Sequence, residues 1–324
     1  MVSVLMLPWL AHGHISPFLE LAKKLTNKNN NFYIFICSTP VNLSSIKSKL
    51  SEEYSHCIEF VELHLPHDDL PPHYHTTNGL PPHLMATLKR AFDMASPNFS
   101  NILKTLKPDL LIYDFLQPWA PSLALLQNIP AIEFSIMNAA LLSSICAHDL
   151  NNPTAKFPLH LRDYDIRKFH NQCEFSSNGI KDGDRIQQCC ARSCKIILVK
   201  TSGEIEAKYV DYLSDLVKKK IVPVGPLVQD PMDQTLDEET WIMKWLNKRE
   251  RSSSNRPPAL EVQNPNASAQ TRLARRQADE YDIMPFQPSR TSSVKIHPPD
   301  GMGSSLTIVL PFQDSQFHPR TSIE

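Results

Sequence analysis

Glycine is scarce in this sequence, with 8 residues among 324. The usual share in proteins is roughly 7%, which is about three times as much. Loops that hold phosphate groups through their backbone N–H groups need several closely spaced glycines. A glycine-rich phosphate-binding loop is therefore hard to build from this composition.

Neither sign of charge is in excess, and long apolar runs are missing as well. Lys and Arg number 33 against 34 Asp and Glu, which leaves a net charge of −1. Nucleic acids and anionic membranes attract a surplus of positive charge, so neither is an expected partner. The apolar start at residues 1–8 has no basic leader and is far shorter than the ~18 residues of a membrane span. We expect a soluble protein that begins with a strand.

The seven cysteines are odd in number and form no C-x-x-C pair, which argues against a disulfide framework. Reduced thiols indicate a reducing compartment, and we expect a cytoplasmic protein. Five histidines crowd residues 64–83, where His73 and His75 form an H-x-H pair that could bind a metal. They lack cysteine partners or a rigid frame, so we predict a solvated loop and no metal site.

Strand and helix patterns alternate along the first 226 residues. The first helix pattern opens at Ser16 and Pro17, with Ser as N-cap and Pro as the first helical residue. This alternation is typical of a doubly wound α/β domain with a parallel sheet. Seven runs rich in apolar, aromatic and β-branched residues are the predicted strands, at residues 2–8, 31–38, 57–65, 109–115, 130–136, 195–201 and 221–226. Further helices are expected at 84–106, with a break near Ser96 and Pro97, and at 118–127, 184–193 and 203–219.

Composition divides the chain into three parts. Residues 1–228 carry the α/β pattern, and residues 229–252 have the polar, proline-containing character of a linker followed by one short helix. Residues 253–324 contain a single lysine and nine prolines, whereas residues 1–252 contain 19 lysines. The last part has too little patterned apolar sequence for a core, and only Leu306–Leu310 is typical of a strand. We expect it to be largely disordered.

Two ionisable side chains follow strands of the predicted sheet, at the edge where ligands bind in such folds. His14 follows the first strand and Asp114 ends the fourth. A carboxylate that holds one imidazole nitrogen leaves the other free to accept a proton, which would make the pair a general base. The residues alone also allow a structural role, in which His14 caps the following helix or bonds a backbone carbonyl. His12 is a second candidate for the base.

Several segments resemble plant UDP-dependent glycosyltransferases of small molecules, which are enzymes of secondary metabolism. The resemblance covers residues 1–253, and its motifs follow one another in the family's order. The last three segments are similar to the branch that extends sugars already attached to flavonoids or terpenoids. The matching segments are residues 8–25, 108–124, 197–213, 222–228 and 245–253.

The resemblance implies a mechanism and a set of site residues. His14 would be the catalytic base that activates a hydroxyl of the acceptor, and Asp114 would orient it. A UDP-sugar would be the donor substrate, with inversion at its anomeric carbon and no cofactor. Near the predicted strand ends, an apolar acceptor pocket could be lined by Trp9, Phe115 and Met137, with Gln117 and Asn138 available for hydroxyl groups.

One departure from the family concerns its second domain, which binds the UDP-sugar. That domain carries a Trp near the uracil, a His-x-Gly-Trp segment and an Asp-Gln pair, and residues 253–324 contain none of these. The resemblance therefore implies the N-terminal, Rossmann-like domain of a two-domain glycosyltransferase fold, with the second domain missing and the chain inactive by itself. The alternative is a non-catalytic module that binds a small molecule in the same cleft.

Overall fold

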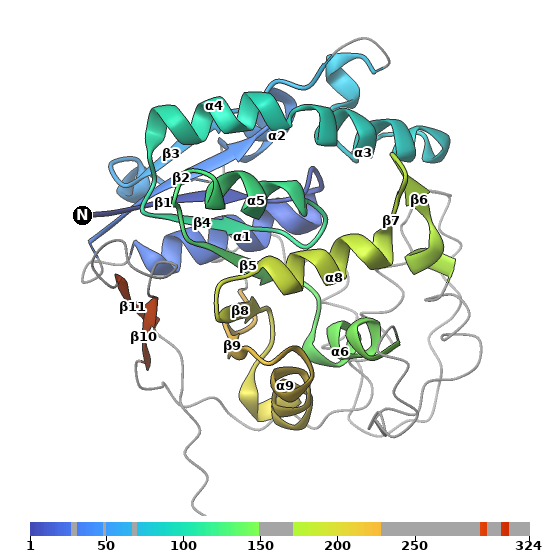
Figure 1. Cartoon of the computed structure of the whole chain (residues 1–324). Helices are drawn as coiled ribbons and strands as arrows, with labels where there is room; N and C mark the ends of the chain where they lie inside the picture. The colour runs from blue at the N-terminus through green and yellow to red at the C-terminus, as the bar shows by residue number, and fades with distance from the viewer. Residues whose placement is uncertain are drawn as a thin grey trace, which may run out of the picture. The chain divides into compact units, whose positions relative to one another are not determined.

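Seven parallel strands form one sheet in this computed structural model, in the order β3-β2-β1-β4-β5-β8-β9 (Figure 1). The structure describes residues 1–26, 31–47, 50–66, 70–148, 171–227, 292–296 and 306–310. All seven predicted strands are present, so the prediction of a doubly wound parallel sheet is confirmed. The strands are β1 (Val2–Leu7), β2 (Phe32–Ser38), β3 (Ile58–Glu62), β4 (Leu110–Tyr113), β5 (Ala131–Ser135), β8 (Ile196–Val199) and β9 (Lys220–Pro223).

Helices cover both faces of the sheet, because alternate strand residues point to opposite sides. One core joins α1 and α2 to one face, and two further cores join the remaining α-helices to the other (Figure 1). The helices are α1 (His12–Leu25), α2 (Pro40–Lys47), α3 (Met85–Met94), α4 (Ser96–Leu106), α5 (Trp119–Leu125), α6 (Ala139–His148), α8 (Asp182–Arg192) and α9 (Gly203–Val217). Short 3-10 turns lie at Glu52–Tyr54, Pro72–Tyr74 and Pro82–Leu84, and a small hairpin is formed by β6 (Ser176–Ser177) and β7 (Ile180–Lys181).

The direction in which the chain adds strands to the sheet reverses between β1 and β4. From β1 the chain winds through β2 to β3 on one side, and from β4 it winds through β5 and β8 to β9 on the other. Because the connections leave these neighbouring strands in opposite directions, this is the switch point of the sheet, and folds of this kind bind ligands in a crevice beyond the carboxyl ends there. Leu7 and Tyr113 are paired at those ends, so the residues that follow them lie together.

Helix α1 begins five residues earlier than predicted. Its N-cap is the extended Ala11, whose carbonyl accepts hydrogen bonds from the N–H groups of His14 and Ile15, each at 2.9 Å. Pro17 therefore lies inside the helix rather than at its first position. It has no N–H to donate, so the bond to the carbonyl four residues back is absent. The consequence is that His14 belongs to the first turn of α1 and not to the preceding loop.

Helix α6 was not predicted, although Asn138 before it is a local N-cap residue; its first N–H groups also bind a residue distant in sequence. The Glu206 carboxylate accepts hydrogen bonds from the N–H groups of Ala139 at 2.8 Å and Ala140 at 3.3 Å. A carboxylate at this position satisfies unpaired N–H groups and suits the helix dipole. Glu206 lies in α9, so this contact also fixes the pairing of α6 with α9.

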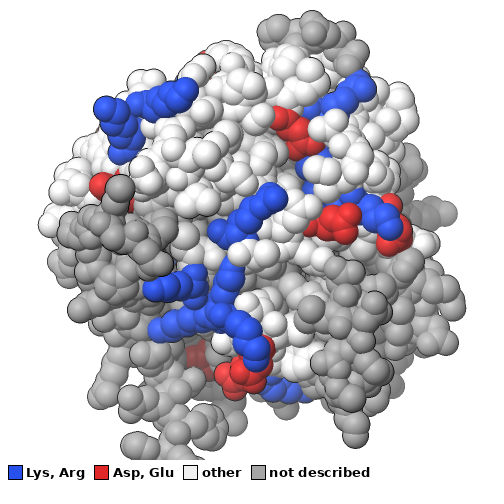
Figure 2. Space-filling model, viewed as in Figure 1, with Lys and Arg blue, Asp and Glu red and all other residues white. Residues whose placement is uncertain are grey.

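Lys219 closes the end of α8 in a similar way. Its Nζ donates to the carbonyls of Cys190 at 2.6 Å, Ala191 at 2.7 Å and Ser193 at 2.6 Å. Figure 2 shows Lys and Arg side chains gathered over this end of α8 and the neighbouring strands β8 and β9. A cation at the last carbonyls of a helix stabilises it, so part of this basic surface has a structural role.

The C-terminal part can be compared with the prediction at two segments only. The predicted strand Leu306–Leu310 is present as β11, and it pairs in antiparallel fashion with β10 (Ser292–Ile296), which was not predicted. The predicted linker and helix at residues 229–252, and the other residues of the expected tail, lie outside the described residues.

Glu133 is a buried acid in the middle of the sheet. Its side chain is fully buried in β5, and within the described residues neither carboxyl oxygen accepts a hydrogen bond from an N–H or O–H group. The thiol of Cys190 is its polar neighbour. Burial, reinforced by the charge of Asp114, raises the pKa of the Glu133 carboxyl from 4.5 to about 8.

We predict that Glu133 makes stability fall as the pH rises. Between pH 4.5 and 8 the folded protein holds a proton on Glu133 that the unfolded chain releases, so the free energy of unfolding decreases over this range. Glu133→Gln should flatten this dependence in urea titrations at pH 5 and pH 8, while Glu59→Gln, at an exposed position, should not. An unchanged slope in Glu133→Gln would contradict the assignment.

Candidate active site

His14 and Asp114 meet at the crevice, as predicted from the sequence. Nδ1 of His14 lies 2.7 Å from Oδ2 of Asp114, although the two residues are 100 positions apart. The His14 side chain is 13% exposed and the Asp114 side chain is fully buried. A buried carboxylate thus holds an imidazole that is partly exposed at the surface.

Backbone N–H groups determine where the Asp114 carboxylate lies. Trp9 N–H donates to Oδ2 at 2.9 Å, and Phe115 N–H donates to Oδ1 at 2.8 Å. Asp114 N–H in turn donates to the carbonyl of Leu7 at 3.2 Å. Both oxygens of the carboxylate act as acceptors, so the donor in the contact with His14 is Nδ1–H.

This arrangement leaves Nε2 of neutral His14 with a free lone pair. No hydrogen-bond partner of Nε2 is found among the residues that the structure describes. A carboxylate that accepts from one ring nitrogen fixes the tautomer and stabilises the imidazolium once the other nitrogen takes a proton. The pair therefore has the geometry of a general base.

The structure shows what each of the two candidate histidines bonds. The N-cap of α1 is Ala11, and no side chain caps the helix there. The ring of His14 bonds a carboxylate and not a backbone carbonyl. His12, the second candidate, places Nε2 3.0 Å from Oγ of Ser45 in α2. Its ring is therefore engaged with another helix.

Phe115 and Trp9 differ in their relation to the site. The ring of Phe115 lies 5.2 Å from the imidazole of His14, centre to centre, so it borders that imidazole. Trp9 is only 4% exposed and packs edge-on against Phe92 at 5.4 Å. The prediction that Trp9 lines an acceptor pocket does not fit this burial, because its indole belongs to the core and its backbone serves Asp114.

Gln117 is also held within the protein. Its Nε2 donates to the carbonyl of Leu7 at 2.9 Å, and its Oε1 accepts from Leu116 N–H at 3.1 Å. The side chain is fully buried, so it has no surface to offer an acceptor hydroxyl. Its role is to tie the turn after β4 to the end of β1.

Met137 and Asn138 follow β5 and are partly exposed. Oδ1 of Asn138 accepts a hydrogen bond from Leu141 N–H at 2.8 Å, which caps α6. The amide NH₂ of Asn138 has no partner within the described part of the chain. These two residues therefore keep groups that a bound molecule can contact.

No residue-type pattern pointed to the backbone donors Trp9 and Phe115, because every residue except proline carries an N–H group. In the loop at residues 70–83, the sequence prediction was wrong for one histidine. His75 was expected in a solvated loop, but it is buried, and its Nε2 lies 2.8 Å from the carbonyl of Leu70. It is part of a packed segment.

A metal site and a membrane span were both tested in the part of the chain that the structure describes. There, no three His, Cys, Asp or Glu side chains are grouped closely enough to hold a metal ion. None of the helices in that part is long and apolar enough to cross a membrane. All seven cysteines are described, and each is a free thiol.

We predict that Asp114→Ala abolishes the preference of His14 for a proton on Nδ1, because the acceptor of that proton is removed. The ¹⁵N chemical shifts of the two ring nitrogens, assigned by comparison with His14→Ala, measure this preference. Asp109→Ala is the matched control, since Asp109 lies at the opposite end of β4 and bonds Ser3 at 2.8 Å. Unchanged ring shifts in Asp114→Ala would refute the assigned contact.

Comparison with known proteins places these features in a family. The family model of the glycosyltransferase N-terminal domain matches residues 1–229. UDP-glucosyltransferase 29 of Panax ginseng is 54% identical over 254 residues, which are 78% of this chain and 56% of that protein. A beta-D-glucosyl crocetin beta-1,6-glucosyltransferase of Gardenia jasminoides is 48% identical, over 77% of this chain and 57% of the relative. The chain thus spans little more than half the length of these relatives.

Solved structures agree at the level of the fold. Glycyrrhiza uralensis UGT73P12, complexed with glycyrrhetinic acid 3-O-monoglucuronide, has a TM-score of 0.56 at 17% identity, over 70% of this chain and 49% of its own. Arabidopsis thaliana UGT89C1 has a TM-score of 0.55 at 18% identity, over 76% of this chain and 54% of its own. Together, the family match over residues 1–229 and the identity to plant enzymes show that this chain belongs to the UDP-dependent glycosyltransferases and carries their N-terminal domain.

Proposed function

We propose that this chain carries the acceptor-binding domain and the catalytic base of an inverting glycosyltransferase. The reaction transfers a sugar from a UDP-sugar to a hydroxyl of a flavonoid or terpenoid glycoside. The observation that carries the proposal is the contact of His14 with Asp114, which leaves Nε2 unengaged at the crevice. The choice of acceptor is supported by relatives named for glycosides, such as the flavanone 7-O-glucoside 2''-O-beta-L-rhamnosyltransferase of Citrus maxima, which is 46% identical.

The proposed mechanism uses one proton transfer and one displacement. Nε2 of His14 takes the proton of the acceptor hydroxyl, and the Asp114 carboxylate stabilises the resulting imidazolium. The hydroxyl oxygen attacks the anomeric carbon from the face opposite UDP. The bond from that carbon to the UDP oxygen breaks, and UDP leaves with the electron pair. The configuration inverts without a covalent enzyme intermediate or a cofactor.

The acceptor wall is proposed from Phe115, which is 8% exposed but borders the imidazole, and from the partly exposed Met137 and Asn138. Phe115 offers an aromatic edge beside the imidazole, and Met137 offers an adaptable apolar side chain. Asn138 offers an NH₂ donor for a hydroxyl of the acceptor. Binding sites for small molecules combine apolar walls with a few such polar groups.

The division of labour follows the domains expected from the sequence. We assign acceptor binding to residues 1–228, a linker to residues 229–252 and no part in the reaction to residues 253–324. Holding two reactants together contributes roughly 7–11 kcal/mol in well-oriented reactions. Since the proposal gives this chain a site for the acceptor only, we expect very weak sugar transfer by the 324-residue chain alone. We also propose that the protein is located in the cytosol, where its thiols stay reduced.

The competing function is a binding module that uses the cleft without chemistry. Incubation of the purified chain with radiolabelled UDP-glucose and a flavonoid glucoside tests for transfer. Transfer that is abolished by His14→Ala supports the enzyme. Binding of the glucoside without transfer and without affinity for UDP is expected both from the module and from an acceptor-binding domain without its donor domain, so a chimaera with the donor part of a relative decides between them.

We predict that the role of His14 as the base can be measured once the donor-binding part is supplied by a relative. Residues 1–252 would be joined to the part of the Panax ginseng UDP-glucosyltransferase 29 that this chain does not cover. His14→Ala should lower kcat of this chimaera about 10²- to 10⁴-fold, the usual contribution of a general base. His12→Ala is the matched control and should leave kcat nearly unchanged, because its ring bonds Ser45. An active chimaera that tolerates His14→Ala would reject His14 as the base.

A further inference from the structure

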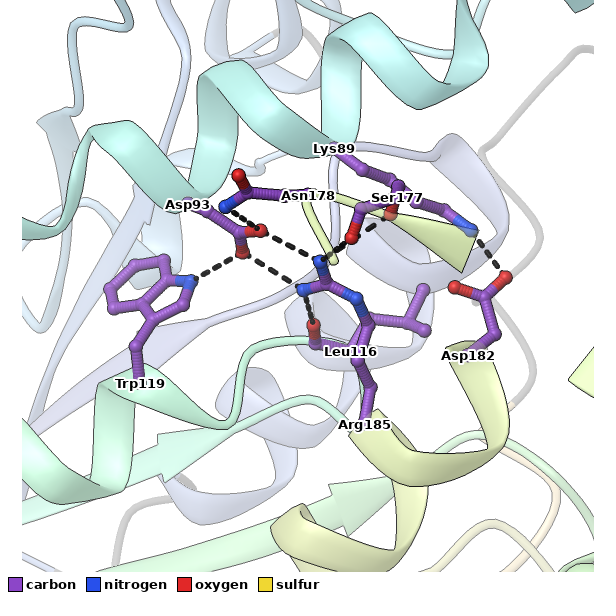
Figure 3. Close-up of polar contacts among 8 residues, drawn as sticks. All are labelled: Lys89, Asp93, Leu116, Trp119, Ser177, Asn178, Asp182 and Arg185. Atoms are coloured by element: carbon purple, nitrogen blue, oxygen red, sulfur yellow. Dashed lines mark hydrogen bonds and ion pairs between the residues drawn. The ribbon is translucent and has the colours of Figure 1, made fainter. Parts of the chain in front are cut away.

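A buried arginine lies behind the turn that carries Asp114. Arg185 comes from α8, and its side chain is 2% exposed. Its two terminal nitrogens donate to the carboxylate of Asp93 in α3, at 2.9 and 2.7 Å (Figure 3). Asp93 also accepts hydrogen bonds from the indole N–H of Trp119 and from Asn178 Nδ2, each at 3.1 Å. Four nitrogen donors from three side chains thus converge on the Asp93 carboxylate.

The same guanidinium reaches the turn after β4. One of its nitrogens donates to the carbonyl of Leu116 at 3.4 Å, and the other donates to the carbonyl of Ser177 at 2.9 Å. Figure 3 shows the guanidinium between the Asp93 carboxylate and the Leu116 carbonyl. A planar fork with several N–H groups can serve a carboxylate and two carbonyls at once, whereas a lysine ammonium cannot do so in this geometry.

Leu116 follows the two residues that shape the site. The turn begins with Asp114, which holds His14, and continues with Phe115, whose ring borders the imidazole. Gln117 ties this turn to the end of β1 on one side. Arg185 ties it to α8 and α3 on the other side, so the turn is held between two anchors.

A second ion pair joins the same two helices without touching the turn. Lys89 of α3 bonds Asp182 of α8, and these side chains are 9% and 17% exposed. The ammonium of Lys89 also lies 4.8 Å from the centre of the Phe175 ring. In Figure 3 this pair lies to one side of the guanidinium. It provides a comparison in which helix packing is weakened but the Leu116 carbonyl is not released.

We propose that Arg185, oriented by Asp93, is a positioning residue for the His14–Asp114 pair. It fixes the Leu116 carbonyl and thereby keeps the Asp114 carboxylate and the Phe115 ring in place against the imidazole. The consequence for catalysis rests on the proposed function. The positioning itself does not, because the state of the imidazole can be measured in the absence of any reaction.

The test observes the His14 ring in the full 324-residue chain labelled with ¹⁵N-histidine. In the unaltered protein we expect the neutral ring to carry its proton on Nδ1. Arg185→Met should abolish this preference. Arg185→Lys, which keeps a cation for Asp93 but has no second arm for Leu116, should weaken it while leaving the protein folded. Lys89→Met should leave the ring signals unchanged even if it lowers the melting temperature.

Two results would overturn the proposal. One is an unchanged Nδ1–H preference in folded Arg185→Lys and Arg185→Met. The other is an equal loss in Lys89→Met, which would show that any weakening of the contact between α3 and α8 disturbs the site. Neither result bears on whether His14 is the base, because the chimaera decides that question separately.

Discussion

The Asp114 carboxylate joins three parts of the fold at one point. It accepts hydrogen bonds from Trp9 at the end of β1, from Phe115 in its own turn and from His14 in α1. Each donor comes from an element whose position is defined by the parallel pairing of β1 with β4. A buried carboxylate is stable only when such partners are present, so the candidate base depends on the correct register of these two strands.

The sheet was predictable because each strand is a short apolar run between turn signals, and such runs need no distant information. The helix starts were less so. The Ser-Pro signal at residues 16 and 17 is a common helix opening. In the structure, however, the first hydrogen bonds of α1 are accepted by the carbonyl of Ala11, which lies before that signal. The start of α6 has a local cap in Asn138, but it also binds Glu206, which is 67 residues from Ala139, and no local pattern announces that contact.

The site shows the same division between position and orientation. His14 and Asp114 were predictable because the switch-point rule brings the ends of β1 and β4 together. Trp9 and Gln117 do follow the ends of β1 and β4, as predicted. Residue type does not reveal, however, whether a side chain near a strand end faces the crevice or the interior. Arg185 gave no signal, since its partner Asp93 is 92 residues away and surface arginines are common.

His14 and Asp114 are 100 positions apart, so they are made at different times during synthesis. When the N-terminal strand and helix leave the ribosome, the imidazole has no carboxylate to meet. Chain growth at about 5–20 residues per second delays that meeting by several seconds. During this interval the inner edge of β1, where β4 will pair, is open. An unpaired strand edge of this kind is a site at which chains can associate, so the pairing of β4 with β1 closes that edge and completes the His14–Asp114 contact together.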